Sequence, residues 1–374
     1  MKPKMKIKSS NCILKIVSAL VLLSAPVKTA FACTGITLKG ADGSIVVART
    51  FEWGAFDFGS RVLVVPRDHE IVSHTPDGSP GLTYTTKYGV VGIDAAGELG
   101  TAEGMNEEGL VVGAFYLPGF AEFQPYDKST ADKSLGPTEL MLYLLSQFKT
   151  VEEVRKGLDK IRVVPVVLEA LGIAAPLHYR VVDSAGNHLI IEYIKGGELT
   201  LFEAPLKVIT NSPTYDWHMN NVRNYIGLSS QGLPEKAIEG VSYGPFGAGS
   251  GMFGLPGDST PPSRFIQAVA FAQTARKTGG GIDTVNEAFR ILDHFNLGTS
   301  SAEGADISAD SKVPSATQWT VAADNKNRVF YYHTAWNRRV RSVDLNSIDF
   351  DTVKLQTIPL DKDRRQDIEE VSVK

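Results

Sequence analysis

Short apolar runs of strand type occupy both ends of the sequence, and helical patterns occupy its middle. Two runs near the start flank the turn residues Asp42-Gly43, as in a β-hairpin, and a third strand follows. Because strands and helices that segregate along a chain pack as separate layers, this order predicts a layered α+β domain whose sheets are completed by C-terminal strands. The predicted strands cover residues 34–38, 45–49, 61–65, 88–93, 110–116, 177–182, 188–194, 318–323, 328–333 and 338–343.

Helical spacing marks the middle of the sequence. Leu140, Leu144 and Phe148 fall on one stripe, and Thr150 with Glu153 forms a capping box ahead of a second helix. The other predicted helices follow the turn at residues 211–213, follow the proline pair at 261–262, and carry the apolar positions of 285–292.

The first 32 residues differ in character from the rest of the sequence. Lys2, Lys4, Lys6 and Lys8 lie ahead of an apolar run over residues 16–25, and Ala30-Phe31-Ala32 follows. This pattern is typical of a secretory signal with a small-x-small cleavage site. The run is too short to span a bilayer, which takes about 20 apolar residues. We therefore expect removal of residues 1–32, export to a periplasm or the medium without a stable membrane anchor, and a single domain over residues 33–374.

The charge of the predicted mature chain bears on which kinds of partner it can bind. Without the leader the chain keeps 32 basic and 42 acidic residues, because the leader contains six lysines and no acid. Nucleic acid is therefore an unfavourable partner for the predicted mature chain.

Cysteine content points to a reactive thiol. Of the two cysteines, Cys12 lies in the leader and Cys33 directly follows Ala32. A lone thiol in an oxidising compartment is either incidental or kept for its reactivity, and its place at the cleavage point favours reactivity. A lipid-bearing cysteine is the alternative for this junction, but such sites usually carry Leu where this chain has Ala30.

A cysteine at a chain start carries its own base. The thiolate is the attacking species, a free thiol has a pKa near 8.5, and an α-amino group has a pKa of about 7.7 to 8. The amine can accept the thiol proton, so no histidine is required. Arg49 and Glu52, on the strand predicted to pair with the first one, place a cation and a carboxylate nearby.

Six ordered motifs of the mature chain resemble those of the choloylglycine hydrolases and penicillin V acylases, which are cysteine N-terminal-nucleophile hydrolases. The resemblance covers essentially the whole chain after the leader. The motifs are Cys33-Thr34-Gly35, Ala48-Arg49-Thr50, Gly104-Met105-Asn106-Glu107-Glu108-Gly109-Leu110, Thr210-Asn211-Ser212-Pro213-Thr214, Gly254-Leu255-Pro256-Gly257-Asp258 with Ser263-Arg264-Phe265, and Thr317-Gln318-Trp319-Thr320.

The resemblance implies a role for each matching residue. Cys33 would be the nucleophile and, through its amine, the base. Arg49 would hold the thiolate and touch the substrate, Asn211 would donate to the oxyanion, and Arg264 would stabilise the region around the nucleophile. Glu52 stands where the family usually has Asp, and it would meet the amine with a carboxylate one methylene further out.

The resemblance also implies the fold, the assembly and a preference among substrates. The fold would be a four-layer αββα sandwich, and homotetramers are common in the family. Tyr116 falls where bile salt hydrolases tend to have Asn and penicillin V acylases have Tyr, and a phenol can donate to an oxyanion as an amide can.

The expected activity is hydrolysis of a linear carbon–nitrogen amide through an acyl-enzyme thioester. In falling order, the candidate substrates are penicillin V-like or N-acyl amino compounds, acyl-homoserine lactones and conjugated bile salts. A non-catalytic, lipid-anchored binding protein is the alternative from another class. The aromatic side chains that could line a pocket for an apolar acyl group, or equally pack in a core, are Phe51, Trp53, Phe56 and Phe58.

Two remaining features carry less weight. Residues 249–254 match a dinucleotide fingerprint as a string, but they lie in a Gly-rich stretch, residues 240–257, with no apolar strand before it. We expect that stretch to be a long functional loop. The sequence has no zinc, calcium or phosphate-loop motif, so neither a metal nor a cofactor is implied.

Overall fold

A six-stranded antiparallel sheet contains the first strand of the described chain. The computed structural model describes residues 33–54, 57–95, 100–302 and 316–373. The strand order is β14-β1-β2-β17-β18-β19, so a C-terminal strand pairs directly with the N-terminal hairpin. The bounds are β14 Val208–Ile209, β1 Thr34–Lys39, β2 Ile45–Trp53, β17 Ala316–Asp324, β18 Val329–Thr334 and β19 Arg341–Asp344.

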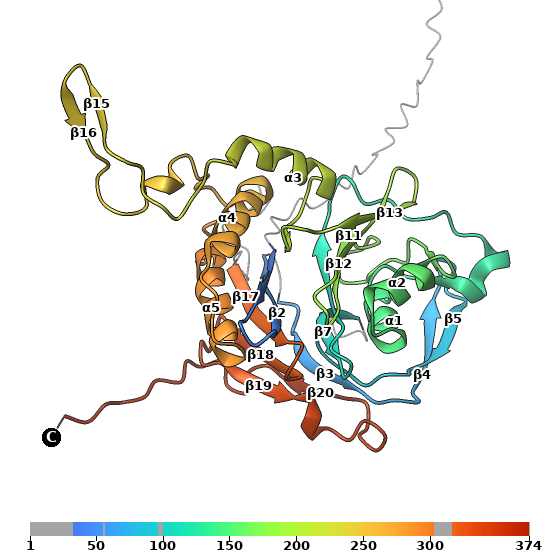
Figure 1. Cartoon of the computed structure of the whole chain (residues 1–374). Coiled ribbons are helices and arrows are strands. Elements are labelled where there is room, and N and C mark those ends of the chain that lie inside the picture. The colour runs from blue at the N-terminus through green and yellow to red at the C-terminus, as the bar shows by residue number, and fades with distance from the viewer. Residues whose placement is uncertain (1–32, 55–56, 96–99, 303–315, 374) are drawn as a thin grey trace, which may run out of the picture.

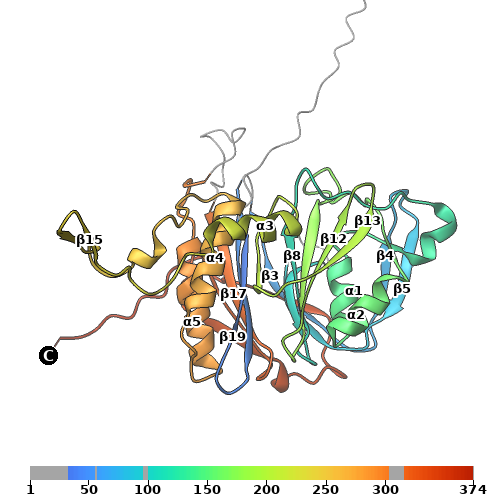
Figure 2. The same cartoon turned by 45° about the horizontal axis from the view of Figure 1, so that its top comes forward.

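An eight-stranded sheet faces the first one, as Figure 2 shows. Its order is β13-β12-β11-β8-β7-β6-β3-β20. The bounds are β13 Glu198–Glu203, β12 His188–Ile194, β11 Leu177–Val182, β8 Val111–Tyr116, β7 Thr101–Asn106, β6 Val90–Asp94, β3 Arg61–Val65 and β20 Gln356–Pro359.

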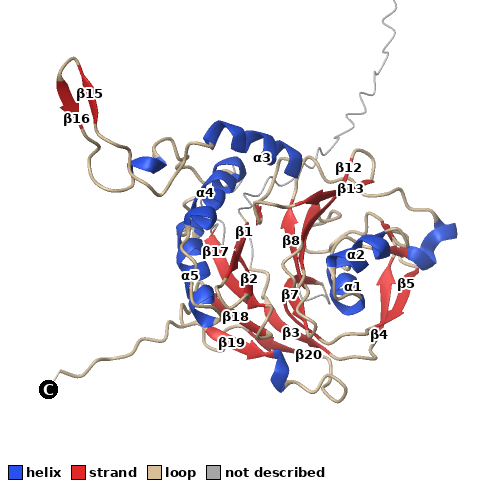
Figure 3. Cartoon of the chain, viewed as in Figure 1, coloured by secondary structure: helices blue, strands red, loops and turns tan. Residues whose placement is uncertain are grey.

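Helices cover the two outer faces (Figures 1 and 3). Helices α4 (Pro261–Thr274) and α5 (Ile282–Leu292) pack on the six-stranded sheet, and α1 (Leu140–Gln147) with α2 (Val151–Leu158) covers the eight-stranded sheet. The result is the four-layer αββα sandwich. No helix in the described ranges is long and apolar enough to cross a membrane.

Shorter elements complete the described chain. They are α3 Tyr215–Asn221, the strand pairs β4 Glu70–His74 with β5 Pro80–Thr85, β9 Ser134–Leu135 with β10 Arg162–Val163, and β15 Lys236–Ile238 with β16 Val241–Tyr243, and the 3₁₀ helices η1 Lys128–Lys133, η2 Val222–Tyr225, η3 Ser250–Met252, η4 Asp293–Phe295 and η5 Leu345–Ser347.

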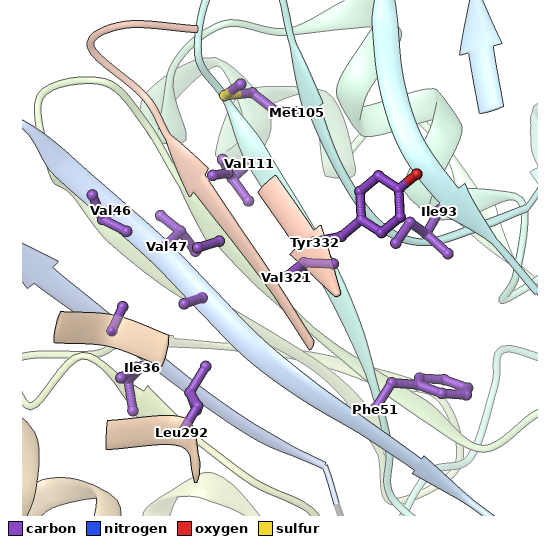
Figure 4. Packing of buried hydrophobic residues seen from close by; sticks show 14 of the residues in the cluster. Ile36, Val46, Val47, Phe51, Ile93, Met105, Val111, Leu292, Val321 and Tyr332 are labelled. Atoms are coloured by element: carbon purple, nitrogen blue, oxygen red, sulfur yellow. The ribbon is translucent and has the colours of Figure 1, made fainter. Parts of the chain in front are cut away.

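The main hydrophobic core lies between the sheets and beneath α5. Val47, Val321 and Tyr332 come from the six-stranded sheet, and Met105 and Val111 come from the other sheet (Figure 4). Because side chains alternate across a strand, the intervening residues of β2 face the helices. Every residue of β2 is therefore buried.

Helix α2 begins as its capping box predicts, with one difference. Thr150 Oγ1 accepts a hydrogen bond of 3.1 Å from Glu153 N. Glu153 Oε2 accepts from Lys149 N at 2.9 Å, one residue earlier than the reciprocal bond of a capping box would be.

Most predicted elements are present, and several strands escaped prediction. The predicted strands at 177–182 and 188–194 match β11 and β12, and all predicted helices are found. The third predicted strand, 61–65, is β3, but it belongs to the second sheet rather than to the N-terminal hairpin's sheet. β7 was missed because its sequence, Thr-Ala-Glu-Gly-Met-Asn, has few residues of high β propensity, although all of it is buried.

Candidate active site

Cys33 lies immediately before β1 and is 4 % exposed. β14 pairs with β1 so that Gly35 faces Ile209, and continuing this antiparallel register brings Asn211 beside Cys33. Cys33 N donates to Asn211 Oδ1 at 2.7 Å. Two residues that are 178 positions apart are thus joined by the pairing of two short strands.

Arg264, in the first turn of α4, holds the same two residues, Cys33 and Asn211. Its Nη1 donates to Cys33 O at 2.6 Å and to Thr34 Oγ1 at 2.8 Å, and its Nη2 donates to Asn211 Oδ1 at 2.8 Å. Burial lowers the pKa of this guanidinium, and the nearby charge of Glu52 opposes that shift. Arg264 therefore holds the Cys33 main chain and the Asn211 carboxamide together.

Arg49 approaches the site from the space between the sheets. Its Nη1 donates to Ala114 O at 2.5 Å and to Ala102 O at 3.2 Å, and the guanidinium carbon lies 4.0 Å from the centre of the Phe115 ring. Its Nη1 is 3.7 Å from Glu103 Oε2, and both side chains are completely buried. Desolvated ions persist only when they are paired.

Glu103 joins Arg49 to a second buried arginine. Arg180 Nη2 donates to Glu103 Oε1 at 2.8 Å. Neither glycine beside this cluster has room for a side chain: a Cβ at Gly113 would lie 1.9 Å from Glu103 Oε2, and one at Gly35 would lie 2.6 Å from Arg180 Nη1. Glu103 and Arg180 escaped the sequence analysis, because a partner in the opposite sheet leaves no local pattern.

Glu52 lies on the other face of β2 from Arg49, since the two residues are an odd number of positions apart. Its Oε1 accepts from Thr317 Oγ1 at 2.9 Å, and its Oε2 is buried with no hydrogen-bond partner among the described residues. Burial raises the pKa of Glu52 to about 7, against the opposing charge of Arg264. The resemblance implies that Glu52 meets the free α-amine of Cys33. In the unprocessed chain the Cys33 nitrogen is a main-chain amide, and its single hydrogen goes to Asn211 Oδ1.

Burial and nearby charged groups shift the pKa of the Cys33 thiol in opposite directions. Burial raises the pKa of the thiol, and the positive charge of Arg49 is the largest influence that lowers it. The charge of Glu52 raises the thiol pKa, whereas the main-chain amide of Glu52 and the charge of Arg264 lower it. The structure therefore brings Arg49, Glu52 and Arg264 into electrostatic contact with one sulfur.

Asn211 and Tyr116 both carry groups that could donate a hydrogen bond to an oxyanion. Asn211 Nδ2 donates to Tyr116 O at 2.9 Å, which uses one of its two amide hydrogens. Tyr116 lines the same pocket as Cys33, and burial raises the pKa of its phenol to about 12. The phenol is therefore protonated at neutral pH and is able to donate.

An apolar pocket opens beside the thiol. Phe51, Trp53 and Phe58 are buried in its wall, and the Trp53 ring meets the Phe58 ring edge-on at 4.4 Å. Phe51 stacks on Trp319, a residue of the sixth motif, with ring centres 4.5 Å apart. Phe56 lies outside the described residues. The rest of the wall comes from Ala95, Gly100, Thr101, Ala102, Ala114, Thr138, Leu168, Leu171, Ala175 and Leu177.

The dinucleotide-like string at 249–254 has no matching structure. Gly249 precedes η3, a single 3₁₀ turn of three residues, and the strand before it, β16, is exposed. A dinucleotide site needs a buried strand followed by a full helix. Within the described ranges, no group of three or more His, Cys, Asp or Glu side chains could hold a metal ion.

Comparison with known proteins identifies the class. The family model described as linear amide C–N hydrolases, choloylglycine hydrolase family, matches residues 33–358. The chain belongs to this family, and it is a hydrolase of linear amides. The match begins at Cys33.

Individual relatives agree with this assignment. A bile salt hydrolase/transferase of Clostridium perfringens is 30 % identical over 88 % of this chain and 97 % of its own. A penicillin V acylase of Pectobacterium atrosepticum is 28 % identical over 92 % of this chain and 88 % of its own. A crystal structure of a conjugated bile acid hydrolase of C. perfringens superposes with a TM-score of 0.78, at 26 % identity, over 91 % of this chain and all of that chain.

Proposed function

We propose that the protein is an exported amidohydrolase whose nucleophile is Cys33, exposed as the first residue of the mature chain. The observation that carries the proposal is the position of the buried thiol. It lies at the end of an apolar pocket, influenced by two guanidinium groups, and its main-chain nitrogen donates to Asn211. We propose periplasmic or secreted localisation because residues 1–32 have the pattern of a secretory signal.

In the proposed reaction, Cys33 Sγ attacks the amide carbonyl carbon while the α-amine takes the thiol proton. The oxyanion accepts hydrogen bonds from Asn211 Nδ2 and the Tyr116 phenol. The C–N bond then breaks, the amine product leaves with the proton held by the α-amine, and a thioester remains. Water attacks the thioester, which releases the acid and restores the thiol.

The surroundings of the Cys33 nitrogen suit a free amine. A main-chain amide has one hydrogen, which Asn211 Oδ1 accepts. Cleavage after Ala32 would give this nitrogen further hydrogens, and Glu52 Oε2 is a buried acceptor with no partner in the described chain. The charge of Glu52 also acts on the Cys33 thiol, whose pKa it raises. Glu52 would thus take the role that the family's Asp has.

The pocket favours an acyl group without charge. Its aromatic wall and the side chains of Leu168, Leu171 and Leu177 would desolvate an aromatic or fatty acyl group. We rank penicillin V-like and N-acyl amino compounds first, because Tyr116 stands at the oxyanion side, and acyl-homoserine lactones next. Conjugated bile salts complete this ranking, and the names of several relatives support them as a candidate class.

A hydrolysis panel with penicillin V, an acyl-homoserine lactone and a conjugated bile salt tests the proposal. Cys33→Ala should abolish turnover of every substrate that the natural chain cleaves, while the melting temperature stays within a few degrees. Turnover retained by Cys33→Ala would disprove the mechanism. A folded protein that binds these compounds without cleaving them would favour the alternative, a binding protein.

Intact mass of the exported protein tests the processing. We expect 342 residues that begin at an unmodified cysteine. An added diacylglyceryl mass would instead show a lipid anchor, and any other N-terminus would remove the α-amine on which the mechanism depends.

We also propose assembly into a homotetramer through an arm formed by residues 229–253. The arm is closed at its base by the bond from Ser229 N to Gly251 O, at 2.9 Å, and it carries β15 and β16 away from the sandwich (Figure 1). Its exposed large apolar side chains would be covered by a second copy of this chain. They are Leu233, Ile238, Val241, Tyr243, Phe246 and Phe253.

A further inference from the structure

Asn211 lies in a short connection between β14 and α3, and three buried side chains hold the main chain of this connection. We propose that His178, Glu192 and His218 are positioning residues that fix Asn211 beside Cys33. The inference rests on the proposed function, because it assigns a purpose to residues that act on Asn211 and not on the substrate.

The first contact is a buried histidine–carboxylate pair. His178 on β11 and Glu192 on β12 are cross-strand neighbours, with His178 Nδ1 3.0 Å from Glu192 Oε1. His178 Nε2 lies 3.0 Å from Thr210 O, and Glu192 Oε1 also accepts from Tyr215 N at 2.9 Å. The pair therefore ties down the residue before Asn211 and the first residue of α3.

Hydrogen-bond chemistry fixes how the His178 ring is oriented. A carbonyl oxygen can only accept, so His178 Nε2 donates to Thr210 O. Glu192 Oε1 is the partner of the other ring nitrogen, Nδ1, and it also accepts from Tyr215 N. A carboxamide at position 192 keeps only one acceptor oxygen, so Glu192→Gln perturbs this contact.

The second contact comes from α3. His218 Nε2 lies 2.9 Å from Asn211 O, and the same reasoning makes it a donor. The His218 ring stacks on Phe265 at 4.6 Å, next to Arg264, which donates to Asn211 Oδ1. Burial lowers the pKa of His218 to about 4, so the ring is neutral and Nε2 carries its single hydrogen.

These contacts set where the Asn211 carboxamide can be. Its Oδ1 accepts from Cys33 N and its Nδ2 donates to Tyr116 O, so a small shift of the main chain disturbs both sides of the site. Misplacement by about 1 Å can lower a rate a hundredfold. His178 and His218 contact main-chain oxygens of residues 210 and 211 and are not themselves catalytic residues.

Variants of His178 test the proposal in the full-length processed protein. Gln can still donate to Thr210 O through its amide, whereas Leu cannot. We expect His178→Leu to lower kcat at least about tenfold with less than about a twofold change in KM, and His178→Gln to stay within about threefold of the natural kcat. The matched control is His188→Leu, at the first residue of β12 and four residues before Glu192, where the buried imidazole contacts Gly186 O.

Combination with Asn211→Ala separates positioning from a general effect on the fold. If His178 acts through Asn211, then adding His178→Leu to Asn211→Ala should lower kcat no further. A full additive loss in the double variant, or equal losses in the His178→Leu and His188→Leu variants, would overturn the inference. If His178→Leu fails to fold, Glu192→Gln replaces it, both alone and in combination with Asn211→Ala.

The failure of the inference is distinguishable from the failure of the proposed function. Activity that Cys33→Ala abolishes but that His178→Leu and Glu192→Gln leave unchanged would overturn the positioning role alone. Activity that survives Cys33→Ala would overturn the proposed function.

Discussion

At the scale of single residues, Glu52 shows how burial changes the pKa of a carboxyl group in the site. Its carboxyl group is close to two guanidinium groups, yet burial prevails and its pKa is raised to about 7 from an ordinary 4.5. The folded protein therefore holds a proton at Glu52 that the unfolded chain releases between these two values. Stability from this group is fully present below about pH 4.5 and is lost as the pH rises through about 7.

Glu52→Gln should remove this part of the pH dependence. The natural chain should lose up to about 3 kcal/mol of unfolding free energy relative to the Gln variant between pH 4.5 and pH 8, from the shift of the Glu52 pKa. Urea unfolding at a series of pH values checks this. Glu198→Gln, at an exposed carboxylate on β13, is the control. Parallel pH profiles for the natural chain and Glu52→Gln would contradict the assignment.

Sequence motifs pointed to several of the residues that surround Cys33, but they could not point to the residues that hold these in place. Arg49, Asn211 and Arg264 were predicted because they lie in motifs that can be read along the chain. Glu103 was not, because it meets Arg49 only when two sheets face each other. The geometry of Glu52 also required the structure, since the alternation of β2 turns it away from Arg49.

At the scale of elements, local signals predicted helices better than strands. The cap at Thr150 and the periodic apolar residues after it are contained within one segment, and α2 begins directly after that residue. Strand partners are set by contacts that are distant in sequence. β3 thus follows the N-terminal hairpin along the chain but joins the opposite sheet.

Thr150→Ala should destabilise the protein by about 1 kcal/mol, because it removes the acceptor for Glu153 N at the start of α2. Thr150→Ser keeps that acceptor and should stay close to the natural stability. Thermal unfolding measures both variants. Equal melting temperatures for Ala and Ser would show that the cap contributes nothing measurable.

At the scale of the whole molecule, the arm is the part of the described chain that departs most from a sandwich. Its Phe246 and Phe253 side chains are 107 % and 82 % exposed. The stretch at 240–257 was predicted to be a functional loop, and most of it lies in this exposed arm, outside the pocket that Cys33 lines. Assembly is the function that we propose for the arm.

Phe246→Ser combined with Phe253→Ser should lower the solution mass from that of four chains to that of one or two. Light scattering after size-exclusion chromatography measures this directly. Val167→Ser, at an exposed apolar residue elsewhere, should leave the mass unchanged. A natural chain that elutes as a monomer, or a double variant that remains tetrameric, would contradict the proposed contact.

The central place of β17 in its sheet sets the order in which a newly made chain can become active. Until residues 316–324 are synthesised, β2 lacks its neighbour, Glu52 lacks Thr317, and Phe51 lacks the ring beneath it. The residues that line the pocket lie between Cys33 and Leu177, but the strand and the ring that support them from behind come late in the chain. We therefore expect a chain truncated upstream of β17 to be inactive, so a half-made chain would not cleave amides prematurely.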